Sequence, residues 1–337
     1  MTTISDLGEK KLIAEFIRPL FNPEDDVRGV GDDCAMVFEG NDVWLFSTDR
    51  VPADLIAFRL GLINHRGLGR YLATLNLSDL AACGGRPIGL LLNLGLPGEL
   101  GYEEFQELCR GFQEIAAMFD CRVLGGDITH SRELSISATS IGKGVRGRVL
   151  TRRGAMAGDT LFCSRPVGMT PAAFAYLLMD DKPVVTTAEV DVLVAQFKCL
   201  LPLVDLGWEL AASTRCSSCM DNTDGLGQSF LELGLASRVA CVIEEQRLRI
   251  PTVVEKIASQ IGVDPMRLAF GAGADFSLIG SLKGTWGQGE VGAAFGNEVL
   301  VIGHVEEGVG VFLDREGHRA PLEFTGWNYF VNGKTNP

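Results

Sequence analysis

The sequence predicts a two-domain protein of mixed helices and strands, in the α+β or α/β class. Its 337 residues exceed what one typical core organises and fit two domains of ordinary size. Hydrophobic residues make up 46% of the chain and charged residues 22%, which is typical of a well-packed globular protein. Short strand-like runs alternate with amphipathic helical patterns, with glycines between them. These observations give the fold class and leave the strand order open.

The first half of the chain carries the clearest periodic patterns. A helix is expected at 102–119, where large apolar side chains recur at steps of three and four residues. A second, buried helix is expected at 66–83, and it should end before Pro87. The other expected elements are a short amphipathic helix at 11–20, an aspartate-rich loop at 22–33, and strands at 43–49, 88–96, 121–124 and 134–141.

A polar passage at 142–158, punctuated by glycines, marks the expected domain boundary. It is the most basic stretch of an acidic protein and contains four arginines. We therefore predict an N-terminal domain at 1–148 and a C-terminal α/β domain at 149–337. The second domain is expected to contain strands at 160–163, 239–243 and 299–305 and helices at 170–178, 190–212 and 226–237.

Five aspartate-bearing motifs, each expected to be a turn, are the strongest functional signal. At least three of them follow apolar runs, and carboxylates at the ends of buried elements can converge although they are distant in the sequence. Oxygen ligands of this kind suit magnesium that carries a polyphosphate. Asp beside Gly, Ser or Thr is also ordinary turn chemistry, but five motifs in such contexts favour a metal site. They are Gly31-Asp32-Asp33, Ser47-Thr48-Asp49, Ser78-Asp79, Gly125-Gly126-Asp127 and Asp221-Asn222-Thr223-Asp224.

Charge and cysteine content limit the class of protein. A net charge of −13 is unfavourable for a broad surface that binds nucleic acid or anionic membrane. The first residues lack a signal-peptide pattern and no apolar run has the length of a membrane span, so we expect a cytoplasmic protein with small-molecule substrates. Nine cysteines in mostly apolar surroundings are expected to be reduced, structural thiols. This includes Cys216 and Cys219, which lack the further ligands of a zinc site.

The residue types favour metal-assisted phosphoryl transfer. No Walker motif and no nucleophile elbow is present, and the chain has only four histidines. Phosphoryl transfer relies mainly on metal ions, an arginine and positioning. If the acceptor is itself a phosphate, it is already ionised near neutral pH and needs no general base. We therefore assign no catalytic acid or base.

The motifs, in their order along the chain, resemble those of the thiamine-monophosphate kinase family. This family belongs to the superfamily of aminoimidazole ribonucleotide synthetase and selenophosphate synthetase. The resemblance covers essentially the whole chain. Besides the aspartate motifs, it rests on Asn-Leu-Ser-Asp-Leu-Ala-Ala at 76–82, Leu-Thr-Arg-Arg-Gly-Ala-Met-Ala-Gly-Asp at 150–159 and Phe-Thr-Gly-Trp-Asn-Tyr-Phe at 324–330.

The resemblance implies a two-domain aminoimidazole ribonucleotide synthetase-like fold. The N-terminal domain would dimerise through its sheet, with ATP at the interface of a homodimer. ATP would be the phosphoryl donor and Mg²⁺ the metal. The residues that would hold magnesium are Asp33, Thr48, Asp49, Asp79, Asp127, Asp221 and Asp224. Those that would contact ATP are Thr48, Gly126, Asp127, Arg152 and Thr223.

The acceptor side departs from the family pattern. Ile56 stands where the family has a histidine, and Ala274 stands where it has a glutamate that contacts thiamine, while an aromatic residue is kept at Phe324. Three interpretations stay open. The chain is a thiamine-monophosphate kinase with a rearranged acceptor pocket, a related ATP-dependent enzyme with a different small acceptor, or a nucleotide-binding protein without turnover.

Overall fold

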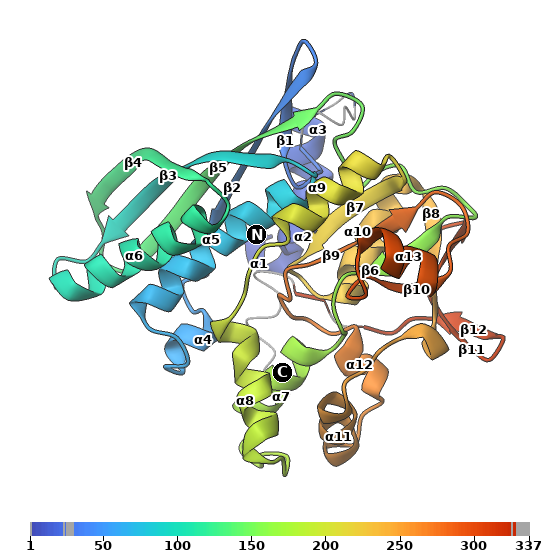
Figure 1. Cartoon of the computed structure of the whole chain (residues 1–337). Helices are drawn as coiled ribbons and strands as arrows, with labels where there is room; N and C mark the ends of the chain where they lie inside the picture. The colour runs from blue at the N-terminus through green and yellow to red at the C-terminus, as the bar shows by residue number, and fades with distance from the viewer. Residues whose placement is uncertain (1, 23, 25–29, 325, 328–337) are drawn as a thin grey trace. The chain divides into compact units, whose positions relative to one another are not determined.

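The computed structural model describes residues 2–22, 24, 30–324 and 326–327 (Figure 1). The contacts within the chain divide it into two compact units. Unit 1 comprises residues 1–32, 150–193 and 214–337, and unit 2 comprises residues 33–149 and 194–213. Each unit contains one β-sheet, so the predicted mixture of helices and strands is confirmed. Parts of the loop expected at 22–33 and of the motif at 324–330 lie outside the described residues.

Unit 2 is built on a five-stranded sheet in the order β1-β2-β5-β3-β4. Only β3 and β4 are parallel among these neighbours; the other pairs are antiparallel. The strands are β1 (Ala35–Glu39), β2 (Asp42–Arg50), β3 (Arg86–Leu96), β4 (Arg122–His130) and β5 (Ser135–Val145). The helices are α4 (Ile56–Arg59), α5 (His65–Ala82), α6 (Tyr102–Met118) and α9 (Val204–Ser213).

Helices α5 and α6 lie along one side of this sheet and pack closely against each other (Figure 1). Glycines allow the close approach: a Cβ atom at Gly69 would lie 2.0 Å from the carbonyl oxygen of Leu108, and one at Gly111 would lie 1.9 Å from that of Arg66. Alternate side chains of β2 and β5, such as Leu45 and Ala138, are buried on the helix side of the sheet. The amphipathic pattern at 102–119 and the buried pattern at 66–83 thus formed the expected helices.

The other face of the sheet, opposite α5 and α6, carries an apolar patch. Trp44 and Phe46 on β2 and Ile141 on β5 point to this side, because their neighbours along each strand are buried toward the helices. A shallow hollow on this face is lined by Val37, Phe38, Glu39, Trp44, Phe46 and Ile141. We call this whole side of the sheet the open face.

Unit 1 is built on a seven-stranded sheet in the order β12-β11-β8-β10-β6-β9-β7. Its strands are β6 (Thr160–Cys163), β7 (Cys216–Asn222), β8 (Val239–Glu244), β9 (Ser277–Leu282), β10 (Leu300–Glu307), β11 (Gly310–Arg315) and β12 (His318–Pro321). Its helices are α1 (Ile4–Leu7), α2 (Glu9–Leu12), α3 (Arg18–Phe21), α7 (Met169–Leu178), α10 (Leu226–Ser237), α11 (Thr252–Ile261), α12 (Pro265–Ala269) and α13 (Gln288–Phe295). A π-helical turn, Ile13–Ile17, joins α2 to α3, a 3-10 turn spans Glu245–Arg247, and α8 (Thr187–Lys198) crosses the division at Leu193.

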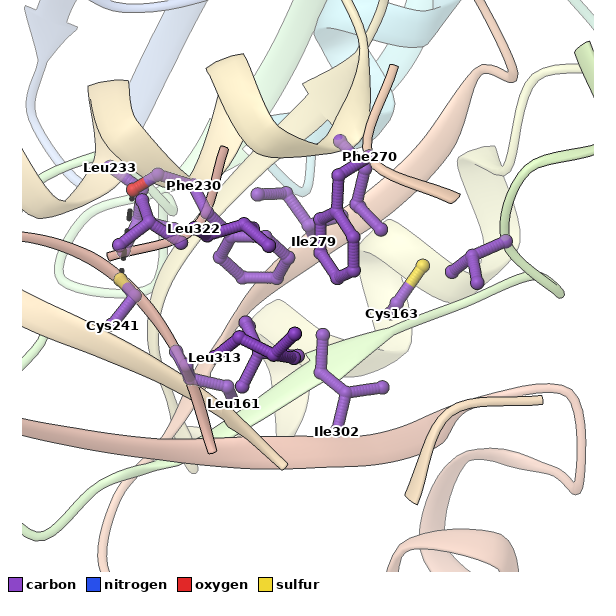
Figure 2. Packing of buried hydrophobic residues seen from close by; sticks show 14 of the residues in the cluster. Leu161, Cys163, Phe230, Leu233, Cys241, Phe270, Ile279, Ile302, Leu313 and Leu322 are labelled. Atoms are coloured by element: carbon purple, nitrogen blue, oxygen red, sulfur yellow. Dashed lines mark hydrogen bonds between the residues drawn. The ribbon is translucent and has the colours of Figure 1, made fainter. Parts of the chain in front are cut away.

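The core of unit 1 lies between its sheet and α10 (Figure 2). Leu161, Phe230 and Ile279 are completely buried in it. The thiol of Cys241 donates to the carbonyl of Phe230 at 3.6 Å, and burial raises the pKa of this thiol to about 12. All nine cysteines lie in the described residues and none forms a disulfide; only Cys199 is exposed, which agrees with the expected structural thiols. No helix in the described part of the chain is long and apolar enough to span a membrane.

Three of the aspartate motifs are not turns, and two of them lie inside elements that the sequence had predicted, the strand at 43–49 and the helix at 66–83. Thr48 and Asp49 lie inside β2, Asp79 lies inside α5, and Gly125-Gly126-Asp127 lies inside β4. In β2 and β4 the reason is that hydrogen bonding to neighbouring strands extends the chain through polar and glycine residues. The pairing of Asp127 with Asn93 on β3 is one example. Sequence patterns detect the apolar run that precedes such residues but not the strand that pairs with them.

The compact units also differ from the two continuous domains that were predicted at 1–148 and 149–337. The main change of unit falls between Val149 and Leu150, but residues 1–32 group with unit 1 and residues 194–213 with unit 2. In unit 2, Thr74 on α5 donates to the carbonyl of Leu200 at 3.2 Å, and Arg86 pairs with Asp205 at 2.8 Å. Long-range contacts of this kind have no signal in local composition.

Candidate active site

Two of the predicted metal ligands meet in unit 2. Carboxylate oxygens of Asp33 and Asp79 lie within 4.8 Å of each other, and Asp33 is only 8% exposed. Asp79 is presented by α5, and the hydroxyl of Ser47 on β2 donates to its carboxylate. Two carboxylates so close together and partly removed from water repel each other unless a cation lies between them. This donor set fits magnesium, which prefers carboxylate oxygens.

The two predicted ligands on β2 point to opposite faces of the sheet. The backbone N–H of Asp49 donates to the amide oxygen of Asn76 on α5 at 3.3 Å, and its side chain lies on the helix side. Thr48 is exposed on the open face, and its hydroxyl donates to the carbonyl of Ala138 at 3.0 Å. Because side chains alternate along β2, Asp49 lies on the side of the sheet that is covered by α5, the helix that carries Asp79. Thr48 lies on the opposite side.

Gly126 and Asp127 lie on β4, the edge strand of the sheet. Gly126 has a φ of +154°, and a Cβ atom there would lie 1.7 Å from the carbonyl oxygen of Leu92, so only glycine fits. Asp127 is exposed and is in register with Asn93, Ser137 and Arg50 on the three neighbouring strands. Paired residues share a face, so Asp127 and Thr48 are both on the open face.

The predicted residues of unit 1 lie around the junction of β7 and α10. Asp221 belongs to β7 and is 2% exposed. Thr223 and Asp224 follow, and α10 begins at Leu226. Arg152 is held at both ends: its backbone N–H donates to the carboxylate of Asp32 at 3.2 Å, and its Nη1 donates to Glu232 at 2.8 Å.

The acceptor-side positions carry no charge. Ile56 is the first residue of α4 in unit 2 and is half-buried. Ala274 is half-buried in the loop between α12 and β9 of unit 1. In the same unit the ring of Phe324 packs on Gly227, where a Cβ atom would lie 2.4 Å from its Cγ. Neither Ile56 nor Ala274 can form a charged hydrogen bond with a cationic ligand.

The N-terminal part of the chain matches a known family model. Residues 31–143 match the N-terminal domain of AIR synthase related proteins. This segment contains Asp33, Asp79 and Asp127 and covers most of unit 2.

Curated proteins and solved structures extend the match to the whole chain. The chain is 27% identical over 323 residues to thiamine-monophosphate kinase of Pyrococcus horikoshii, covering 95% of the chain and 96% of that protein. It is also 27% identical over 310 residues to thiamine-monophosphate kinase of Bacillus subtilis, covering 90% of the chain and 93% of that protein. A solved structure described as AaThiL complexed with AMPPCP and TMP superposes with a TM-score of 0.80 at 26% identity, covering 98% of the chain and 99% of that structure.

The chain is similar to thiamine-monophosphate kinases over nearly its whole length. The fold implied by the resemblance is confirmed, because the match includes the segments of both units. A structure of thiamine monophosphate kinase from Aquifex aeolicus also superposes, with a TM-score of 0.71 at 25% identity, covering 84% of the chain and 91% of that structure.

Sequence reasoning missed two charged residues beside the predicted site. Lys10 on α2 contacts the carboxylate of Asp224, and it lies 2.7 Å from Glu232 on α10. Lys10 belongs to the four-residue helix α2, just before the amphipathic helix expected at 11–20, so nothing in the sequence marked it. Glu232 lies on α10, eight positions after Asp224. Helical residues at this spacing lie on nearby faces, which is only a weak signal.

Replacing Asp275 by Asn is expected to stabilise the metal-free protein near pH 7. Burial raises the pKa of Asp275 to about 6, although a hydrogen bond from Thr170 and the charge of Arg165 oppose the shift. An acid whose pKa is higher when folded loses stability as pH rises, here from about 4 to above 6. A shift of two units corresponds to roughly 3 kcal/mol, and the part of the side chain that stays exposed reduces this to about 1–2 kcal/mol.

Urea unfolding of the wild type and Asp275→Asn at pH 7.5 and pH 4.5 measures this effect. The advantage of the variant should be full at pH 7.5 and clearly smaller at pH 4.5, where Asp275 is protonated in the folded state and partly protonated in the unfolded chain. An advantage of equal size at both pH values, or a loss at pH 7.5, would contradict the explanation.

Proposed function

We propose that this chain transfers the γ-phosphoryl group of ATP to thiamine monophosphate and forms thiamine diphosphate. The observation that carries the proposal is the agreement of 98% of the chain with a structure described as containing both AMPPCP, an ATP analogue, and TMP. Curated thiamine-monophosphate kinases match over nearly the same length.

The donor half of the reaction is assigned to the aspartate motifs. We propose that Asp33, Thr48, Asp49, Asp79, Asp127, Asp221 and Asp224 hold the magnesium ions. Bound magnesium would neutralise the triphosphate and the charge that develops on the transferred group. The backbone at Gly126, together with Thr48, Asp127, Arg152 and Thr223, is proposed to bind and orient ATP.

The acceptor half needs orientation rather than proton abstraction. A phosphate monoester has a second pKa of about 6, so its oxygen is ionised and nucleophilic near neutral pH. This agrees with the assignment of no general base. Phe324 offers an aromatic surface for the acceptor ring, and Ile56 and Ala274 would line the pocket without a charge.

A second candidate is the same transfer to a less cationic phosphorylated acceptor. It is favoured by one observation, the absence of an ionisable side chain at Ile56 and Ala274. Losing a charged hydrogen bond to a cationic ligand costs about 1.5–3 kcal/mol, or roughly ten- to a hundredfold in affinity.

We also propose that the chain forms a homodimer through the open face. A monomer seldom exposes a continuous apolar patch on a sheet, and Val37 and Phe38 are 55% and 36% exposed beside Trp44, Phe46 and Ile141. The same face carries Thr48 and Asp127, so a second copy would lie beside proposed ATP ligands. A cytoplasmic location stays a prediction from the sequence.

Incubating the protein with ATP, Mg²⁺ and thiamine monophosphate tests the main proposal. We expect thiamine diphosphate as product, detected by chromatography, and ADP in equal amount. Ala274→Glu should lower the KM for thiamine monophosphate by roughly ten- to a hundredfold if the missing carboxylate is what weakens this pocket. Ala274→Gln is the uncharged control and should give a smaller gain.

The outcomes separate the two candidates. Absence of thiamine diphosphate, together with ADP release on addition of another phosphate ester, would support the second. Absence of turnover with every acceptor, while a magnesium-dependent ATP analogue still binds, would leave a nucleotide-binding protein without turnover.

A further inference from the structure

A buried carboxylate on α10 has no role in the proposed chemistry. The side chain of Glu232 is 17% exposed and accepts three hydrogen bonds. The donors are Lys10 at 2.7 Å, Arg152 at 2.8 Å and the side-chain amide of Gln228 at 3.0 Å. Burying a charge is costly unless it is paired in this way, so the arrangement is specific rather than incidental.

The two cations on Glu232 connect it to both parts of the proposed donor site. Arg152 is a proposed ATP ligand. Lys10 also contacts the carboxylate of Asp224, a proposed magnesium ligand. All of these residues belong to unit 1. Two positive and two negative charges therefore balance in one cluster, formed by Lys10, Arg152, Asp224 and Glu232.

Glu232 is expected to act on each cation differently. Arginine has a long side chain with many rotamers, and a buried partner fixes its guanidinium group before a ligand arrives. Lys10 divides its charge between two carboxylates. Without the charge of Glu232, it would pair more strongly with Asp224 and compete with a metal ion for that carboxylate.

We infer that Glu232 is a positioning residue for nucleotide binding, which orients Arg152 and shares the charge of Lys10 with Asp224. The inference rests on the proposed function. It concerns only the donor side, so binding of the acceptor alone should not depend on Glu232.

Glu232→Gln tests the role with little change of shape. The matched control is Glu189→Gln, because Glu189 forms a similar pair with Lys256 at 2.8 Å in unit 1 but contacts none of the cluster residues. Calorimetry would measure binding of a non-hydrolysable ATP analogue with Mg²⁺ and, separately, of thiamine monophosphate. We expect Glu232→Gln to weaken binding of the analogue about tenfold and leave thiamine monophosphate unchanged, and Glu189→Gln to change neither.

Two further variants distinguish positioning from general stability. Adding Lys10→Met to Glu232→Gln should restore part of the magnesium-dependent affinity, because the competing cation is removed. Arg152→Met should lose less affinity in the Glu232→Gln background than in the wild type, since its orientation is already lost there. A merely structural residue would give neither rescue nor coupling.

The binding measurements separate failure of the inference from failure of the proposed function. Unchanged binding of the analogue by Glu232→Gln, or an equal loss for thiamine monophosphate, would overturn the inference. If the wild type itself does not bind the analogue with Mg²⁺, the proposed function fails first.

Discussion

Asp79→Asn should abolish magnesium-dependent binding of an ATP analogue, lowering the affinity by at least about a hundredfold. Asp79 lies within 4.8 Å of Asp33, and the two carboxylates together form the densest negative charge proposed for the metal in unit 2. An uncharged amide is a weaker ligand and leaves magnesium with one carboxylate of this pair. Calorimetric titration with and without Mg²⁺ measures the loss.

The fold should survive this substitution. The amide oxygen of Asn can still accept the hydrogen bond from Ser47, and repulsion with Asp33 disappears, so the metal-free variant should unfold at the same or a higher temperature. Asp120→Asn is the control: Asp120 is exposed and has a φ of +52°, which Asn tolerates. Equal binding by Asp79→Asn and the wild type would leave Asp79 as a helix side chain without a metal role.

Ile141→Asp should convert a dimer into a monomer. Ile141 lies near the middle of the open face, paired with Phe46 on β2 and Gly89 on β3. A carboxylate buried there against apolar side chains of a second copy would lack partners, at a cost of several kcal/mol for each copy. Light scattering after size-exclusion chromatography measures the mass directly.

This variant should also bind nucleotide more weakly, because Thr48 and Asp127 share the open face. The control is Val309→Asp, since Val309 is 57% exposed in the turn between β10 and β11 and lies outside unit 2. Val309→Asp should keep the wild-type mass. A wild-type protein that is monomeric at micromolar concentration would rule out the proposed role of the open face.

Much of the fold followed from local patterns. The helix expected at 102–119 is α6 at Tyr102–Met118, and the one expected at 66–83 is α5 at His65–Ala82. Each of these helices has an apolar face that is buried whichever element packs against it. By contrast, β7 was missed because Cys216-Ser-Ser-Cys219 reads as polar, although pairing with β9 buries Cys219 completely. A strand whose partners lie far along the chain is stabilised by contacts that its own residues do not reveal.

The predicted site, like the fold, followed from the sequence only in part. The aspartate motifs identified Asp33 and Asp79, which do approach each other. They did not indicate which of Thr48 and Asp49 lies on the helix side of β2, because that depends on which face of the sheet the helices cover. Lys10 and Glu232 were not found, since a cation and a carboxylate 222 positions apart become partners only in the folded unit.

The sequence by itself determined the resemblance to thiamine-monophosphate kinases, the fold class and the residue types that suit metal-assisted phosphoryl transfer, because these depend on ordered motifs and local periodicity. The tertiary structure alone decided which faces the ligands occupy, why only glycine fits at position 126, and which side chains hold Arg152. These features depend on the register of neighbouring strands and on the packing of α2 and α10 within unit 1. Strand register and helix packing bring together residues that are far apart in the chain, and no local sequence pattern indicates such contacts.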